Sequence, residues 1–346
     1  MDDKHRARRA TVHDVAREAG VSLATVDRVL NGRPGVRTET AGKVEGAIKT
    51  LNFRRDLSAS LLARARDLRV VFLIPDGRNE FMVSLTAAIA RRARSGKTER
   101  LTIEAQKVRA FDAEAIAEAL SALTPKNCDC AVVVATEHEV VRRAIDSAAR
   151  RGVPVVTLVS DLPGSARRHF VGIDNVAAGR TAASLMGRFS GRGKIGLIAG
   201  SLALRDHHER RDGFEAVIRA EFPGLEIVGP VEGFDDNQRT EAAALTLLAE
   251  NGALAGIYNL GAGNAGLLSA LKQTGRAGKL RVIAHELSEP TRAGLLSGAV
   301  DVVIDQNPDG EIAAAIAAAR AVALGHDTEV PSEPIEIGLF LRDNLR

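Results

Sequence analysis

The chain has 346 residues, of which 45% are hydrophobic and 26% are charged, so it can bury a sizeable core. Residues 1–66 hold 14 Lys or Arg and 8 Asp or Glu, a net charge of +6, while the whole chain carries +3. Residues 67–346 therefore carry −3. A basic first fifth on a slightly acidic remainder is typical of a nucleic-acid-binding head on a soluble body.

Targeting and cysteine signals exclude further classes of protein. Residues 1–10 are polar and basic with no apolar run, so they form neither a secretory signal nor a membrane anchor. Cys128 and Cys130 are the only cysteines, too few for a zinc site built from thiolates. We expect both to point to the same face of a strand and to stay reduced in the core of a cytoplasmic protein.

The stretch after this polar arm has the pattern of two short helices separated by a tight turn. Thr11, with Asp14 three residues on, forms a capping-box pattern at the start of the first helix. Gly20 allows the backbone to turn, and Ser22 is a natural cap for the second helix. The apolar residues recur at helical spacing and form one buried side: Val12, Val15, Ala16, Ala19, Val26, Val29 and Leu30. A helix-turn-helix unit is therefore predicted, with a third helix at 38–51 as its support.

Such a unit occurs both in DNA-binding heads and in purely structural bundles. In a DNA-binding head, the start of the second helix touches base edges. The outward side chains crowd that part of the helix: Ser22, Leu23, Ala24, Thr25 and Arg28. Together with the basic charge, they favour a recognition helix.

The run TVHDVAREAGVSLATVDRVLNG, followed by VRTETAGKVEGAIKTLNF, resembles the DNA-binding head of the lactose repressor (LacI/GalR) family of bacterial transcription regulators. The match continues without gaps over about the first 64 residues. The resemblance implies that Leu23, Ala24 and Arg28 read bases. It also implies that five residues lie near phosphates: Thr11, Ser22, Thr25, Asn31 and Thr40. Three residues depart from the family pattern, which usually has Ser, Ser and Tyr there: Asp27, Arg37 and Phe53.

Residues 54–66 link the head to the rest of the chain. On its own, a helix of under about 12 residues is marginal in water. The resemblance implies a hinge helix that orders on DNA, in which Leu62 wedges into a minor-groove base step and Ala59 is a small flanking residue. The alternative is that Leu62 packs against a neighbouring subunit. Arg55 and Asp56 replace the Pro and Asn that the family usually has before this helix.

From residue 68 on, apolar runs of strand length alternate with helical patterns, which indicates parallel sheet covered on both faces. Strands are expected at 68–75, 101–108, 130–136, 153–160, 169–174, 194–200, 225–233, 256–260, 280–286 and 301–306. Helices are expected at 81–95, 112–123, 137–151, 177–189, 205–221, 237–251, 265–274, 289–297 and 309–324. About 280 residues are many for one such sheet, so we expect two lobes.

The order of these runs resembles the type-I periplasmic sugar-binding fold, closest to ribose-binding-type proteins. The implied fold class is α/β: an N-terminal all-α helix-turn-helix head and hinge helix, joined to a two-lobed body with parallel sheets and three crossovers. We place the crossovers near 173–175, 306–308 and 331–334. The predicted divisions are a head at 1–53, a hinge at 54–67 and an effector-binding domain at 68–346, with an N-lobe at about 68–173 and 307–332 and a C-lobe at about 174–306 and 333–346. Ligand is expected between the lobes, at the carboxyl ends of the strands.

Each candidate effector-binding residue lies just past a predicted strand, and carboxylates and amides at such positions suit a polyol. The loop with Asn79, Phe81 and Met82 resembles the first sugar-contacting loop of that fold. By the same resemblance, Arg210 is a sugar-binding arginine, Phe234 a stacking aromatic, Glu286 a sugar-binding carboxylate and Gln306 a hinge-side amide. The remaining candidates are Ser160, Asp161, Asp174, Asn175, Asn259 and Asn264. For Asp161, Asp174 and Asn175, a role as turn or helix cap explains the sequence equally well.

Other chemistries fit the sequence poorly. The glycine-rich turn at 261–266 lacks the Lys-Ser/Thr pair of a phosphate-binding loop. His207 and His208 are helical neighbours, so they do not face one metal. His285 and Glu286 form the only adjacent acid–base pair in the cleft, and neighbours on a strand point apart. We therefore predict no catalytic residue, no metal site and no cofactor.

Two functions from different classes compete. One is a ligand-responsive transcription regulator, and the alternative is a sugar-binding transport component that shares the fold of the body but does not bind DNA. The second needs a signal peptide and no DNA-binding head, which is the reverse of this sequence. We predict a cytoplasmic repressor of carbohydrate uptake or catabolism genes. Its predicted partners are double-stranded operator DNA, a second copy of the chain and a sugar-like effector, with no membrane.

Overall fold

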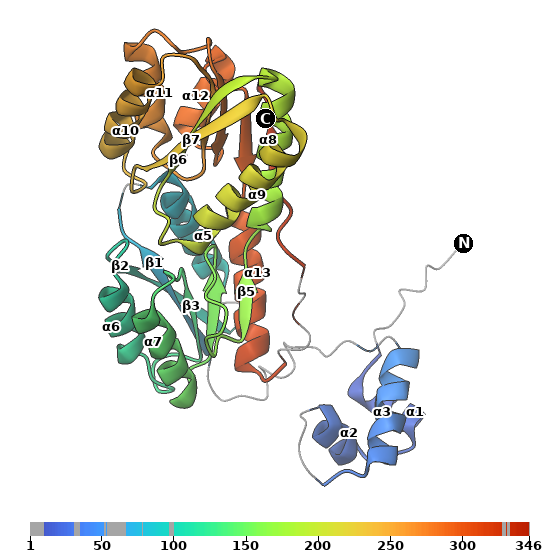
Figure 1. Ribbon diagram of the computed structural model, residues 1–346. Helices are drawn as coiled ribbons and strands as arrows, with labels where there is room; N and C mark the ends of the chain where they lie inside the picture. Colours follow the sequence, from blue (N-terminus) through green and yellow to red (C-terminus); the bar gives the residue numbers. More distant parts are fainter. Residues whose placement is uncertain are drawn as a thin grey trace, which may run out of the picture.

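The computed structural model describes residues 10–30, 35–51, 53, 67–77, 79–96, 100–326, 330 and 333–345 (Figure 1). Three predicted DNA-contacting residues lie outside these ranges: Asn31, Ala59 and Leu62. Their roles stay predictions. Within the described residues, no helix is long and apolar enough to cross a membrane.

Three helices form the head: α1 (Val12–Ala19), α2 (Leu23–Leu30) and α3 (Thr38–Thr50). The predicted capping box is present, since Thr11 Oγ1 accepts the Asp14 N–H at 3.3 Å and Asp14 Oδ2 accepts the Thr11 N–H at 2.8 Å. Gly20 ends α1 in the left-handed region with φ 66°. Ser22 Oγ accepts the Thr25 N–H at 3.2 Å and so caps α2. The helices enclose a small core of Val15, Ala16, Val26, Val44, Ala47 and Phe53.

A five-stranded parallel sheet forms the first lobe of the body, in the order β2-β1-β3-β4-β5. Its strands are β1 (Leu68–Pro75), β2 (Leu101–Val108), β3 (Cys130–Val133), β4 (Val155–Leu158) and β5 (His169–Val171). One face packs against α5 (Glu80–Gly96) and α13 (Pro308–Ala323). The other packs against α6 (Ala113–Ala122) and α7 (Glu139–Arg150). Because α13 comes from the far end of the chain, this lobe is built from two separate stretches of sequence.

A six-stranded sheet forms the second lobe, in the order β11-β10-β9-β8-β6-β7. The strands are β6 (Gly193–Ala199), β7 (Leu225–Glu232), β8 (Leu254–Asn259), β9 (Arg281–His285), β10 (Val302–Asp305) and the antiparallel β11 (Gly338–Phe340). On one face lie α8 (Asn175–Ser190) and α9 (Arg205–Glu221). On the other lie α10 (Asn237–Glu250), α11 (Asn264–Gln273) and α12 (Glu289–Ser297), and a short 3-10 turn, η3 (Arg342–Asn344), follows β11.

Three connections cross between the lobes (Figure 1). The chain passes from β5 to α8, from β10 to α13, and from α13 back to β11. The first and third run side by side, since the Ile335 N–H donates to the Gly172 carbonyl at 2.9 Å and Ile335 pairs with Ile173. The predicted parallel sheets and alternating helices are confirmed. The short strand β11 was not predicted, because three residues carry too little pattern to be read from sequence.

The two cysteines lie on opposite sides of the first sheet. Cys130 is buried against α5 and α13, whereas Cys128 is buried in the core formed with α6 and α7. The prediction that they share a face is wrong, because Cys128 precedes β3 and the alternation of a strand does not extend to it. Both are free thiols, and burial raises the pKa of Cys128 to about 11, so it stays protonated at neutral pH.

Candidate functional site

The start of α2 presents an open surface on the head. Leu23 is 42% exposed although it is apolar, and Ala24 and Arg28 are also exposed. The Ser22 and Thr25 hydroxyls lie 2.9 Å apart at the same end of the helix. Thr11 and Thr40 are half-buried at the starts of α1 and α3. The described residues among the predicted DNA contacts are thus at least partly accessible, and their contact with DNA stays a prediction.

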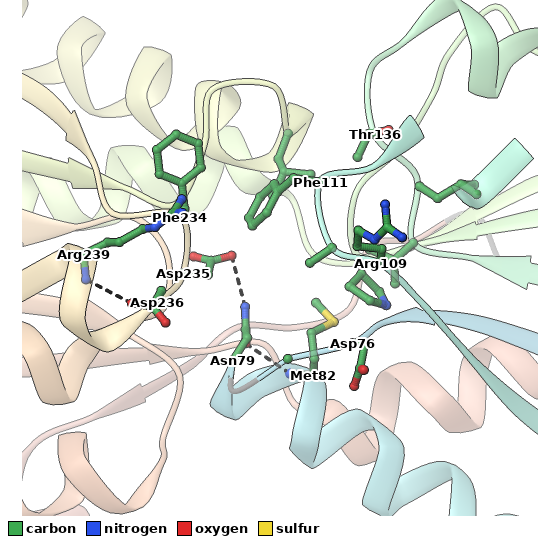
Figure 2. Close-up of a pocket in the computed structure, with 16 residues that line it drawn as sticks. Asp76, Asn79, Met82, Arg109, Phe111, Thr136, Phe234, Asp235, Asp236 and Arg239 are labelled. Carbon is green, nitrogen blue, oxygen red and sulfur yellow. Dashed lines mark hydrogen bonds between the residues drawn. The ribbon is translucent and has the colours of Figure 1, made fainter. Parts of the chain in front are cut away.

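Between the lobes of the body lies a pocket of about 260 Å³, close to the ~300–1,000 Å³ typical of small-molecule sites (Figure 2). It lies beyond the carboxyl ends of β1, β2 and β3 in one lobe and beyond β6 and β7 in the other. Its walls include Asp76, Asn79, Met82, Arg109, Phe111, Thr136, Leu204, Phe234, Asp235, Asp236 and Arg239. This is where ligands of open α/β sheets bind.

Aromatic side chains from the two lobes meet at this pocket. The rings of Phe111 and Phe234 pack edge to face, with centroids 6.0 Å apart. The Arg239 guanidinium lies 5.1 Å from the centroid of the Phe234 ring, within cation–π range. Both aromatic side chains remain more than a third exposed, so they offer apolar surface to a ligand.

Polar contacts also join the two lobes. Asn79 Oδ1 accepts the Phe81 and Met82 N–H groups and so caps the start of α5, while its Nδ2 donates to Asp235 Oδ2 at 3.0 Å. Asn237 Nδ2 donates to Glu80 Oε1 at 3.2 Å. These bonds hold the start of α5 against the loop that precedes α10.

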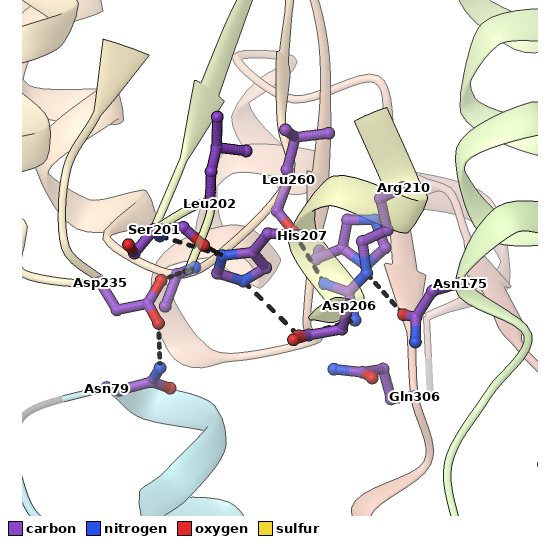
Figure 3. A network of polar contacts seen from close by, with 12 residues as sticks. Asn79, Asn175, Ser201, Leu202, Asp206, His207, Arg210, Asp235, Leu260 and Gln306 are labelled. Carbon is purple, nitrogen blue, oxygen red and sulfur yellow. Dashed lines mark hydrogen bonds and ion pairs between the residues drawn. The ribbon is translucent and has the colours of Figure 1, made fainter. Parts of the chain in front are cut away.

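Behind the pocket lies a buried polar cluster centred on Arg210 of α9 (Figure 3). Its Nε donates to Asn175 Oδ1 at 2.9 Å and its Nη1 donates to the Leu260 carbonyl at 2.7 Å. Its Nη2 has no hydrogen-bond partner among the described residues and lies 3.9 Å from Asp206 Oδ2. Gln306 faces this group from the crossover between β10 and α13.

Two glutamates complete the cluster. Gln306 Nε2 donates to Glu286 Oε1 at 2.5 Å, and Glu286 Oε2 has no partner among the described residues. Burial raises the pKa of Glu286 to about 8, and the nearby Asp305 carboxylate adds to the shift. Glu311, in the first turn of α13, is fully buried with neither carboxyl oxygen hydrogen-bonded to a described residue. Burial raises the pKa of Glu311 well above its ordinary value.

His285 does not form an acid–base pair with the glutamate beside it. Its Nε2 lies 2.8 Å from the Tyr258 hydroxyl, deep in the second lobe. Burial lowers the pKa of His285 well below its usual range, so the ring is neutral at physiological pH. The contact between His285 and Tyr258 therefore supports the packing of β9 against β8.

The structure brings seven of the thirteen predicted effector residues to the pocket or to the cluster behind it, including Asn175, which accepts from Arg210. Asn79, Met82 and Phe234 line the pocket, and Arg210, Glu286 and Gln306 form the buried cluster. Asn259 and Asn264 lie beside it and brace each other, since Asn259 Nδ2 donates to Asn264 Oδ1 at 2.8 Å. Ser160 is buried at the end of β4, and its hydroxyl has no partner among the described residues.

Three predicted effector residues have other roles. Phe81 is 5% exposed and packs in the core between α5 and the first sheet, because it faces inward on the helix. Asp161 accepts from the Thr157 hydroxyl at 2.6 Å and pairs with Arg167 at 2.5 Å, so its oxygens are already bound. Asp174 is exposed and caps α8 by accepting the Ala177 N–H at 2.8 Å. We exclude these three from the proposed site.

Sequence reasoning missed Phe111, Asp235 and Glu311. Phe111 and Asp235 have φ near 55°, a conformation that non-glycine residues adopt mainly in constrained loops, and the sequence carries no signal for it. Glu311 did carry a signal, because it is an acid on the inward side of an alanine-rich helix. Asp206 also carried a signal in the sequence, because it stands four residues before Arg210 and so shares its helix face.

Comparison with known proteins agrees with this geometry. Residues 11–56 match the family described as bacterial regulatory proteins, lacI family, and residues 70–327 match the periplasmic binding protein domain family. The HTH-type transcriptional regulator GalS of Salmonella typhimurium is 29% identical over 77% of this chain and 76% of its own length. Catabolite control protein A of Staphylococcus epidermidis is 46% identical, over 23% of this chain and 24% of its own length.

Solved structures resemble the body. The glucose-galactose binding protein GanP of Geobacillus stearothermophilus has a TM-score of 0.73 at 21% identity and covers 81% of this chain and 99% of its own. An ABC transporter solute binding protein of Burkholderia graminis, solved in complex with D-arabinose, has a TM-score of 0.75 at 23% identity and covers 81% of this chain and 97% of its own. At this identity the likeness shows the fold of the body.

A helix-turn-helix head on a two-lobed body of the periplasmic-binding-protein fold defines a DNA-binding transcription regulator. The chain belongs to the lacI family of bacterial regulatory proteins, and its body belongs to the periplasmic binding protein domain family. Both matches are to families of regulators and binding proteins.

Proposed function

We propose that the protein represses genes of carbohydrate uptake or catabolism in the cytoplasm, as a homodimer on a pseudo-palindromic operator. A sugar-like effector in the interlobe cleft controls it. The proposal rests on one observation above all. The pocket at the carboxyl ends of the strands is lined by apolar side chains and by Thr136, whose hydroxyl has no partner among the described residues, and further buried atoms without such partners, on Arg210 and Gln306, lie behind it. Such atoms are costly to leave unpaired, and a polyol would satisfy them.

For DNA binding, we propose that the head at 1–53 reads the operator through Leu23, Ala24 and Arg28. One head offers few base contacts, so sequence specificity requires two heads on two half-sites. The residues at 54–67 would connect each head to the effector domain at 68–346. The boundary between its lobes would fall at the three crossovers. The alternative, a transport component without DNA binding, is disfavoured by the match of the head to a regulator family.

For the effector, the apolar and polar parts of the cleft suggest complementary contacts. The rings of Phe111 and Phe234 would pack against the apolar face of a small ring, while Asn79, Arg210 and Gln306 would bind its hydroxyls. Sugar recognition by the similar proteins supports this chemistry, since one is named a glucose-galactose binding protein and another was solved with D-arabinose. The effector itself would be a monosaccharide or a derivative of one.

Fluorescence anisotropy with the duplex upstream of the protein's own gene tests the proposal. The parent protein should bind this duplex far more tightly than a scrambled one, and one sugar of a monosaccharide panel should change that affinity. The same sugar at about 100 times its dissociation constant should stabilise the free protein by about 2.7 kcal/mol.

Matched variants locate the effector site. Gln306→Ala should abolish the response to sugar, whereas Glu250→Gln, at the exposed end of α10, should leave it intact. Sugar binding without sequence-specific DNA binding would instead support the transport alternative. Specific DNA binding that no sugar alters would refute a sugar effector.

A further inference from the structure

The buried cluster contains more negative than positive charge. Asp206, Glu286 and Glu311 carry carboxyl groups and are 4%, 6% and 0% exposed, while Arg210 is the one guanidinium among them. They come from α9, from the loop after β9 and from α13. Buried charges in proteins are normally paired, because leaving one unpaired in a low-dielectric interior is costly. Three acids around one base therefore require a further positive group or bound protons.

Asp206 lies near Arg210 and His207, but no ion pair among the described residues joins Glu286 or Glu311 to a positive side chain. Arg210 already uses two of its nitrogens on Asn175 and on the Leu260 carbonyl. His207 Nδ1 lies 3.1 Å from both the N–H and the carbonyl of Ser201, and its Nε2 lies 3.7 Å from Asp206 Oδ2, so His207 is placed beside Asp206. His285 is neutral for the reason given above. Asp305, which accepts the Leu287 and Asn307 N–H groups at 3.0 Å, adds one more negative charge nearby.

The unpartnered atoms are mostly hydrogen-bond acceptors. Arg210 Nη2 is a donor among them, His285 Nδ1 donates or accepts according to its tautomer, and Gln306 adds an acceptor that is not an acid. The acceptors without a described partner are Asp206 Oδ1, Asn259 Oδ1, Glu286 Oε2, Gln306 Oε1 and both carboxyl oxygens of Glu311. With Glu286 and Glu311 ionised, these acceptors outnumber the donors, so a bound group that donates more hydrogen bonds than it accepts would satisfy them, and an ammonium group has three donors and no acceptor.

We propose, resting on the proposed function, that the effector is a polyhydroxylated amine of the amino-sugar class, bound as a cation. Its ammonium would lie between Glu286 and Glu311, and a hydroxyl oxygen would accept from Arg210 Nη2. A metal ion fits less well, since no three His, Cys, Asp or Glu side chains among the described residues are placed to hold one. An amine on a sugar ring can reach acids that are spread over three elements.

Proton release distinguishes a cation from a neutral sugar. Without a bound cation, burial raises the pKa of Glu286 to about 8, so this carboxyl holds a proton at pH 7, and burial also raises the pKa of Glu311. A cation beside them favours the ionised carboxylates, and protons leave when it binds. A neutral sugar leaves the protonation of these acids almost unchanged. Up to about pH 8, the affinity for the amine should therefore rise with pH for as long as the amine stays charged.

Isothermal titration calorimetry on the full chain at pH 7.0 tests this, in phosphate and in MOPS buffer. The probes are two matched pairs, D-glucosamine with D-glucose and D-galactosamine with D-galactose. We expect the amine of at least one pair to bind about tenfold more tightly than its neutral partner. The binding enthalpy measured for this amine should differ between the two buffers, because each buffer takes up the released protons with its own enthalpy.

Glu311→Gln removes the charge of the proposed ammonium site at nearly constant size, and should abolish the preference for the amine. Asp309→Asn is the matched control, because Asp309 lies in the same turn of α13 but is exposed and paired with Arg91. Tight binding of a neutral sugar without proton release would overturn the amine and leave a sugar effector in place. If no probe binds, both the amine and the sugar effector fail. The calorimetry on the parent decides the matter even if Glu311→Gln does not fold.

Discussion

The pH dependence of stability offers a direct test of the buried cluster, through the substitution Glu286→Gln. Gln keeps the shape of the side chain and can still accept from Gln306 Nε2 through its amide oxygen. What it removes is a titrating group that is 6% exposed in the folded protein. The substitution therefore separates the cost of the charge from the cost of a lost contact.

The expected difference in the free energy of unfolding follows from the shift in the pKa of Glu286. Burial raises the pKa of Glu286 from 4.5 to about 8 in the folded empty protein. Each pKa unit corresponds to about 1.4 kcal/mol, so the full shift amounts to about 5 kcal/mol. Between these two pKa values, the folded state holds a proton that the unfolded state has released. The free energy of unfolding of the parent must then fall, relative to that of the Gln variant, as the pH rises from about 4.5 to about 8.

Urea unfolding at pH 5, 6, 7, 8 and 9, without effector, measures this difference. The gap between variant and parent should widen by up to about 1.4 kcal/mol per pH unit and level off above pH 8. Glu250→Gln, at an exposed position, removes a carboxyl group from water and serves as the control. Parallel pH profiles for Glu286→Gln and the parent would refute the claim that this carboxyl is held in a low-dielectric site.

Four further substitutions test other parts of the protein. Arg28→Ala should weaken operator binding by about 1–3 kcal/mol and affect random DNA far less; equal losses in anisotropy on both would make Arg28 a phosphate contact. Leu62→Ala should weaken specific binding and reduce DNA bending, and unchanged bending in a gel assay would remove the proposed wedge. Gly179→Ala should lower the free energy of unfolding by about 1–3 kcal/mol, because the added Cβ would overlap the Arg210 carbonyl of α9. Gly46→Ala, whose Cβ meets nothing within 4 Å, should instead stabilise the head by about 0.5–1 kcal/mol, as seen by thermal unfolding.

Sequence reasoning predicted the elements of the fold well because their signals are local. The Thr11–Asp14 capping box needs two residues three apart, and the structure contains both of its hydrogen bonds. The run at 68–75 is apolar except for Arg69, because β1 is covered on both faces by helices. The helix predicted at 205–221 coincides with α9. The antiparallel β11 is short and pairs only with β10, so no local pattern could reveal it.

The site was harder to predict because its members meet only after folding. A residue that follows a strand can point into the cleft, cap a helix or enter the core, and composition does not separate these outcomes. Asn79 both caps α5 and reaches Asp235 in the other lobe, whereas Asp174 only caps α8. Phe81 and Phe111 show the same limit for aromatic residues, since the first lies in the core and the second lines the pocket.

The site residues come from both lobes, which explains how effector binding could be transmitted to the DNA-binding head. A ligand shifts a conformational equilibrium only by its different affinity for the two states. Arg210 and Glu286 belong to the second lobe, but Glu311 lies on α13, which packs in the first lobe, the lobe that begins directly after the hinge. A ligand held by all three favours one relative position of the lobes. That position also determines where β1, which follows residues 54–66 in the sequence, lies relative to the second lobe. Glu311 would thus couple the cleft to the head, and a ligand bound by the second lobe alone would bind without altering affinity for DNA.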